Sequence, residues 1–288
     1  MTTLATTPAA RTRPPVGSPP RWRDLWGAEW IKFWSLRSNL VVLTAVPVLV
    51  CLIAYKTAGR TYEAWPGYPD SFRRIYEAGH DALFPPLFTL LMALAGTIGA
   101  QTVLGELTSG LIRTTFIAVP HRSRVLIAKA GVVTAVLTGL GVLVAVPSWA
   151  VTLAAYSGRV TGFSWTSPGV GRFLLASVVV FPVSGLIGMA VAALVRHTAA
   201  TVFALFITFV GLSLAPLSSF DTALHTGRLF TFVGNSLPFA GWIFLTTLGN
   251  TGNIVGHHPS AVHAWIAYGA WAVGSVAVVV AAFRSRDV

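Results

Sequence analysis

Residues 173–195 read FLLASVVVFPVSGLIGMAVAALV, a run of 23 residues without a charged side chain. An α-helix rises about 1.5 Å per residue, and the hydrocarbon core of a bilayer is about 30 Å thick. The run is therefore long enough to cross a membrane as one helix. It indicates that the bilayer is the solvent for this chain.

Five further apolar runs lie on either side of this one, each with roughly the 17–25 residues that a crossing requires, or a few more. They are Asn39–Tyr55, Ala82–Leu104, Ile127–Tyr156, Thr198–Ser218 and Val262–Phe283. Pro47 and Pro147 predict kinks in two of them. Together the six runs predict an all-α polytopic membrane protein with six transmembrane helices.

The apolar segment Leu229–Leu248 is a candidate for a seventh span. Gly234, Asn235 and Pro238 fall near its middle, where they would break a continuous helix. Broken backbone at membrane depth is tolerated where it is buried in protein or lines a cavity. We therefore expect a re-entrant or interfacial pair of short helices at the outer side, between spans five and six.

The composition excludes an ordinary soluble domain. Apolar residues make up 54% of the chain, charged residues only 10%, and the mean hydropathy is +0.71. Soluble domains carry about 25% charged residues. The net charge of +11 comes from basic residues beside the apolar runs, which favours lipid contact and argues against a nucleic-acid partner. The single cysteine, Cys51, provides neither a disulfide nor a cysteine metal site.

The positions of Lys and Arg predict the orientation of the chain. With the N-terminus inside, thirteen of the twenty basic residues fall on inner segments: Arg11, Arg13, Arg21, Arg23, Lys32, Arg37, Arg113, Arg122, Arg124, Lys129, Arg196, Arg284 and Arg286. Inner loops of membrane proteins carry the excess of Lys and Arg. We therefore expect a multi-pass protein of the inner (plasma) membrane with both termini in the cytoplasm.

Residues 1–20 are rich in Thr, Ala, Pro and Arg and contain no apolar run, so they lack the core of a signal peptide. They predict a disordered cytoplasmic tail ahead of a membrane domain that covers residues 21–288. A transit peptide is the weaker alternative, because the prolines oppose an amphipathic helix.

The spans contain almost no ionisable side chains. Lys129 lies near the inner end of the third span, His263 lies at the outer end of the sixth, and no acidic residue falls near a bilayer midplane. Ion-coupled carriers and intramembrane hydrolases need such groups, so we expect no catalytic residue. The pair His257–His258 falls in an outer loop and favours a solvated loop over a metal site. The chain has no G-x-x-x-x-G-K-[ST] sequence and hence no P-loop for ATP.

Small residues recur at four-residue spacing in two spans, as Gly131, Ala135 and Gly139 in the third and as Ser184 and Gly188 in the fourth. Such faces let helices approach closely. We expect them to pack spans of one chain together, with an interface between two copies as the alternative.

Residues 22–37, WRDLWGAEWIKFWSLR, predict an amphipathic helix on the inner leaflet just before the first span. At about 100° per residue, its apolar face holds Trp22, Leu25, Trp26, Trp30, Phe33 and Leu36. Indole rings and basic side chains both favour the headgroup layer. Glu29 falls on the apolar side, where it needs a partner such as Lys32 or a cation of the cytoplasmic loop. A membrane anchor and a role in coupling are both open for this helix.

The inner loop between spans two and three reads GELTSGLIRTTFIAVPHRSRVLIAK from Gly105 to Lys129. Thr108–Ala118 predicts a short helix that ends at the Val119–Pro120 step. Such a helix could transmit a push from a partner to both spans. The alternative is a basic loop that only sets topology.

The two segments together resemble a known family. Before span one the order is E-x-x-K-x-x-S-x-R-S, and after span two it is E-x-x-x-G-x-x-R-T-T-x-x-x-x-P-x-R-x-x-x-x-x-x-K. This order, in these topological places, looks like the permease subunits of ABC-2 type transporters. The resemblance implies an elbow helix before span one, a coupling helix after span two that docks on an ATPase, and short re-entrant helices between spans five and six.

Carried over residue by residue, the resemblance assigns Glu29, Lys32, Ser35 and Arg37 to the elbow helix, and Glu106, Gly110, Arg113, Pro120 and Arg122 to ATPase coupling. It implies a non-catalytic permease, mostly of exporters, which pairs with a second permease copy and a separate ATP-binding subunit. ATP and Mg²⁺ would then lie on that subunit, with no cofactor in this chain. The alternatives are a non-transporting assembly or sensor subunit and a membrane-embedded lipid-modifying enzyme.

Overall fold

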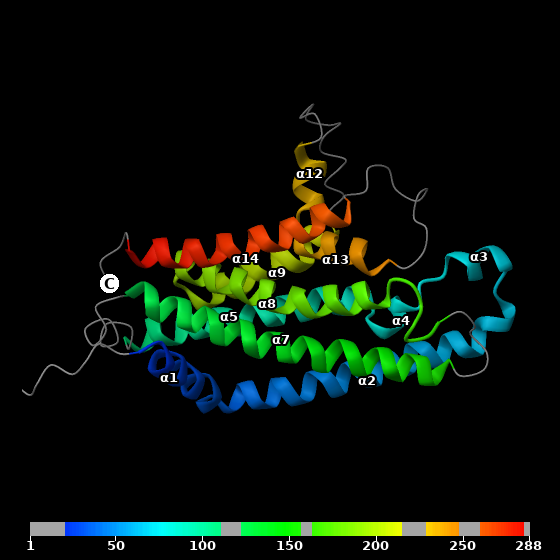
Figure 1. Ribbon diagram of the computed structural model, residues 1–288, viewed down its shortest axis with the longest axis horizontal. Helices are drawn as coiled ribbons and strands as arrows, with labels where there is room; N and C mark the ends of the chain where they lie inside the picture. Colours follow the sequence, from blue (N-terminus) through cyan, green and yellow to red (C-terminus); the bar gives the residue numbers. More distant parts are fainter. Residues whose placement is uncertain (1–20, 111–121, 157–162, 215–228, 248–259, 285–288) are drawn as a thin grey trace, which may run out of the picture.

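The computed structural model describes residues 21–110, 122–156, 163–214, 229–247 and 260–284 (Figure 1). Within these ranges the secondary structure is helical and contains no strand. Long helices lie side by side along one axis, and shorter helices occupy both ends (Figure 1).

Five helices of the described chain are long and apolar enough to cross a membrane. They are α2 (Arg37–Ala64), α5 (Pro85–Ser109), α7 (Arg122–Ala155), α8 (Val170–Val195) and α14 (Ala261–Arg284). This confirms a polytopic α-helical membrane protein and five of the six predicted spans. The helix α8 lies at the centre of the bundle and packs against α5, α7 and α14.

The first span extends well beyond its predicted bounds. The prediction ended at Tyr55, whereas α2 continues to Ala64 and passes through Pro47 without a break. An apolar run marks the part of a helix inside the hydrocarbon core, and hydrogen bonding within the backbone continues the helix past it.

The predicted fifth span is described only in part. It begins with α9 (Thr198–Phe206), continues through a π-helical stretch (Ile207–Gly211) and ends in α10 (Leu212–Leu214). The described length falls short of a full crossing, and residues 215–218 of the predicted span lie outside the described residues. A sixth crossing at this position stays a prediction.

The described part of the segment Leu229–Leu248, residues 229–247, contains a bent pair of helices, as its glycine and proline residues predict. The helices α12 (Leu229–Asn235) and α13 (Pro238–Thr246) meet at an angle of 69°. Trp242 of α13 is fully buried and stacks on Phe88 of α5, whereas α12 buries no residue. A bent pair is compatible with a broken span or with a re-entrant segment, so the re-entrant role stays a prediction.

Glycines set the closest approach in the bundle. A Cβ atom on Gly99 of α5 would lie 2.0 Å from the carbonyl oxygen of Gly185, and one on Gly188 of α8 would lie 1.8 Å from that of Gly96. The two helices therefore touch through their backbones. The small face of the fourth span packs within one chain, as expected, whereas Gly139 of the third span faces open space.

The two ends of the bundle differ. At one end lie α1 (Trp22–Ser35), the last turn of α5, the first turn of α7 and the last turn of α14 (Figure 1). At the other end lie a 3₁₀ turn (Trp65–Gly67), α3 (Asp70–Ile75) and α4 (Gly79–Ala82). The α1 end is the one that the charge distribution assigns to the cytoplasm, and that orientation stays a prediction.

Candidate functional site

Helix α1 is held in a defined position against the bundle. The Asp24 carboxylate accepts a hydrogen bond from the Arg21 backbone N–H at 3.0 Å, which caps the first turn. The helix stops at Leu36, whose backbone is extended, and α2 starts at the next residue. The Asn39 side-chain amide donates to the Phe33 carbonyl oxygen at 2.9 Å, which closes the corner between the two helices.

The buried face of α1 is narrower than the sequence predicted. It consists of Leu25, Glu29 and Phe33, which are spaced four residues apart and therefore lie above one another. The other residues of the predicted apolar face are 40–50% exposed: Trp22, Trp26, Trp30 and Leu36. Exposed indole rings on a helix beside a membrane span suit the headgroup layer. The helix thus fully buries a narrow stripe that includes one carboxylate, and the partly exposed Trp26 ring lies against Gly131 of α7.

That carboxylate has two cationic partners. Glu29 is 5% exposed and accepts a hydrogen bond from the Lys32 ammonium at 2.8 Å, one turn further along α1. Its second oxygen accepts from the ammonium of Lys129, a buried residue of α7. The expectation that Glu29 needs a cation is confirmed: Lys32 is one of the predicted partners, and the second partner comes from α7.

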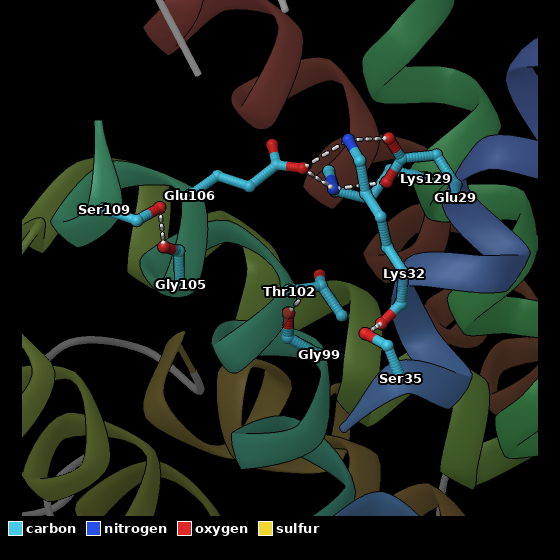
Figure 2. A network of polar contacts seen from close by, with 9 residues as sticks. All are labelled: Glu29, Lys32, Ser35, Gly99, Thr102, Gly105, Glu106, Ser109 and Lys129. Carbon is cyan, nitrogen blue, oxygen red and sulfur yellow. Dashed lines mark hydrogen bonds and ion pairs between the residues drawn. The ribbon is translucent and has the colours of Figure 1, made fainter. Parts of the chain in front are cut away.

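Glu106 in the last turns of α5 completes the cluster. Its Oε1 atom lies 2.9 Å from the Nζ atom of Lys32 and 2.9 Å from the Nζ atom of Lys129. The four ion pairs form a closed ring in which each acid contacts both lysines and each lysine contacts both acids (Figure 2). We call these four residues, Glu29, Lys32, Glu106 and Lys129, the charge ring. It joins three helices, α1, α5 and α7, that lie far apart in the sequence.

The charge ring is electrically balanced, and this balance explains why it can be buried. A single buried ion costs several kcal/mol in lost hydration, and partners on several sides can offset that cost. Lys32 is the most exposed member, with 42% of its side chain accessible. Partial burial lowers the pKa of Lys32, but hydrogen bonds and attraction from Glu29 and Glu106 outweigh it and hold the pKa above the ordinary lysine value.

A cavity of about 310 Å³ adjoins the charge ring. Its walls include Phe33 of α1, Gln101 and Thr102 of α5, and Val132 of α7, along with all four members of the ring. The ring therefore does not fill the space between the three helices.

The other two predicted elbow residues, Ser35 and Arg37, differ in their relation to the ring. The Ser35 hydroxyl donates to the Lys32 carbonyl oxygen at 2.7 Å and lines the cavity, and Arg37 begins α2 with an exposed side chain. The structure thus brings Ser35 to the ring but leaves Arg37 at the corner.

The predicted coupling residues lie on both sides of the connection between α5 and α7. Gly110 ends α5 with a φ of 70°, a left-handed conformation that favours glycine. Arg122 begins α7. Arg113 and Pro120 lie outside the described residues, as do residues 111–118 of the predicted helix Thr108–Ala118. Its first two residues belong to the end of α5.

Lys129 is the member of the ring that the sequence did not assign to a site. A signal for it exists, because it is a lysine within the apolar helix sequence VLIAKAGVV. Ionisable groups inside spans pair with one another. Glu29 was an acid without a settled partner, and matching these two unbalanced charges would have placed Lys129 in the cluster.

Comparison with models of known protein families found no match for this chain, and comparison with curated protein sequences found none either. The geometry is therefore the available guide to function. In the described part of the chain, no group of three or more His, Cys, Asp or Glu side chains is placed to hold a metal ion. The charge ring consists of two ammonium groups paired with two carboxylates, and these pairs link the three helices electrostatically.

Proposed function

We propose that this chain is the permease subunit of an ABC transporter of the ABC-2 type, which acts with a separate ATP-binding subunit. The resemblance of the two inner segments supports this proposal. The observation that carries it is the charge ring, which ties α1 to α5 and α7 directly beside the connection that would receive the partner.

The ring suits a mechanical role. A force applied at the connection between α5 and α7 acts on the last turn of one helix and the first turn of the next. Because Glu106 and Lys129 lie near those turns and both contact α1, the three helices would move as one body. Removal of one partner from a buried ion pair costs about 3–5 kcal/mol, because it leaves an uncompensated charge, so the loss of a buried member should loosen the link between the helices.

The rest of the assembly follows from the family resemblance. Arg113, Pro120 and Arg122 would face the ATP-binding subunit, which holds ATP and Mg²⁺. A second permease copy would complete the transport path, and substrate would be exported. The termini would lie in the cytoplasm and the spans in the plasma membrane.

Co-purification tests the proposal. The chain is expressed with each candidate ATP-binding subunit from its own genome, extracted in mild detergent and recovered by an affinity tag, and ATP turnover is measured in the complex. We expect wild type to retain one of these subunits. The substitution Arg113→Glu should lower both retention and turnover, because charged contacts set specificity in such interfaces.

A matched control is Arg23→Glu, which reverses an exposed charge on α1 at the same end of the bundle. It should retain the partner at the wild-type level. If no P-loop protein is retained by wild type, the transporter proposal fails. If a partner is retained but Arg113→Glu changes neither retention nor turnover, the coupling surface lies elsewhere.

A further inference from the structure

Helix α2 presents one long exposed face to its surroundings. Only 22% of its most apolar stretch is buried, the lowest share among the five long helices of the described chain. Val48, Leu49 and Leu52 are all more than half exposed. At about 100° per residue, the exposed Tyr55, Lys56, Arg60 and Glu63 continue the same face towards the end of the helix. An apolar stripe therefore runs directly into a charged one.

The change from apolar to charged falls at a definite depth. Arg37 begins α2, and Lys56 lies nineteen residues later, which corresponds to about 28 Å along the helix axis. The hydrocarbon core is about 30 Å thick. If Arg37 lies at one headgroup layer, Lys56 lies at the other, and Arg60 and Glu63 lie just beyond it. The charged part of the face is therefore at the level of lipid headgroups.

A groove of about 530 Å³ lies beside these charges, where α2 meets the end of α7. Its floor and walls are formed by Tyr55, Gly59, Tyr62, Glu63, Val151, Ala154 and Ala155. The groove exists because small residues face each other across the two helices. A Cβ atom built on Gly59 would meet nothing within 4 Å. Tyrosine side chains beside such a space match the preference of aromatic rings for the interfacial layer.

Charges of both signs lie at the groove and on the adjoining surface of α2: Glu63 lines the groove, whereas Lys56 and Arg60 lie outside its lining. Lys56 and Arg60 are exposed cations, Glu63 is an exposed anion at the groove itself, and none of the three forms an ion pair with another described residue. A phosphodiester matches the two cations, and a primary ammonium matches the carboxylate. A quaternary ammonium donates no hydrogen bond, and an uncharged alcohol headgroup offers Glu63 no cation.

We propose that this groove and the adjoining exposed face of α2 bind an amine-bearing phospholipid of the leaflet at the α3–α4 end of the bundle. Its phosphate lies between Lys56 and Arg60, its ammonium contacts Glu63, and an acyl chain follows Val48, Leu49 and Leu52. The site is independent of the transporter proposal, because it needs only the membrane, α2 and the end of α7.

Native mass spectrometry of the full chain from defined nanodiscs tests this assignment. The nanodiscs contain equal parts of phosphatidylethanolamine, phosphatidylglycerol and phosphatidylcholine. We expect retained phosphatidylethanolamine to exceed each of the others by about two- to fivefold, as one partly exposed ion pair allows. Glu63→Gln should abolish the preference over phosphatidylglycerol. Lys56→Gln combined with Arg60→Gln should lower the retention of all three lipids.

Two control variants separate the site from general charge effects. Asp70→Asn removes an exposed acid at the same end of the bundle but away from the groove, and it should keep the preference. Lys56→Arg combined with Arg60→Lys keeps both charges and should keep the retention. Equal retention of the three lipids by wild type, or an unchanged preference in Glu63→Gln, would overturn the proposal. So would disulfide formation between two copies of a Gly59→Cys variant, because the face would then be an interface between copies.

Discussion

Replacement of Lys129 by methionine is the sharpest test of the charge ring. Methionine keeps much of the length and volume of the lysine stem but removes the ammonium. The side chains of Glu29 and Lys129 are each 5% exposed, so the change leaves two carboxylates in contact with the single remaining lysine, Lys32. The buried cluster then carries one uncompensated negative charge.

The expected cost follows from that burial. Removal of one partner from a buried ion pair costs about 3–5 kcal/mol. For a chain of this size, each kcal/mol lost from the free energy of unfolding lowers the melting temperature by roughly 2–4 °C. The apparent melting temperature should therefore fall by about 6–20 °C. The matched control is Arg124→Met, which removes an exposed cation five residues earlier on the same helix and should shift the melting temperature by no more than about 2 °C.

Tryptophan fluorescence during heating in detergent provides the assay. Four of the ten tryptophans lie in α1, so release of this helix from α7 changes their surroundings directly. The signal should report the loss of α1 contacts at a lower temperature in Lys129→Met than in wild type.

The double variant Glu106→Gln with Lys129→Met removes one charge of each sign and leaves the neutral pair Glu29–Lys32. It should regain a substantial part of the stability that Lys129→Met loses, because the uncompensated charge is gone. A shift in Lys129→Met no larger than in Arg124→Met would refute the reasoning. A double variant at least as unstable as the sum of the two single variants would also refute it.

Three further outcomes are expected. Gly99→Ala and Gly188→Ala should each reduce the amount of folded protein in membranes, because the new methyl group meets the backbone of the facing helix. Gly139→Ala should not reduce it. Size-exclusion profiles after extraction measure the amount of folded protein. The pKa of Lys32 is raised above its ordinary value of 10.5, so its contribution to stability should be complete below pH 10.5 and lost as the pH rises through the raised value. The difference in melting temperature between wild type and Lys32→Met, measured over that pH range, checks the sign. A reporter that is active only outside the cytoplasm, fused after Val288, should give no signal, and a strong signal would contradict the predicted orientation.

The membrane class and five of the spans could be predicted from the sequence because hydropathy is a local property. The run Phe173–Val195 differs from α8 by only three residues at its start, and the interruption at Pro238 predicted the bend between α12 and α13. Each of these features depends on the length of an apolar run or on residues that break a helix. Both kinds of signal can be identified without knowing which helices pack beside the segment.

The sequence also showed that Glu29 required a cation, because an acid on the apolar face of a helix cannot remain unpaired. It could not determine which cation, since the Glu29–Lys129 contact joins residues 100 positions apart and the Glu106–Lys32 contact joins residues 74 apart. Only the packing of α1 against α7 and α5 brings them together. That packing depends on shape, through the buried stripe Leu25 to Phe33, and on the balance of four charges in one place. These are properties of the assembled bundle, whereas hydropathy belongs to each segment alone.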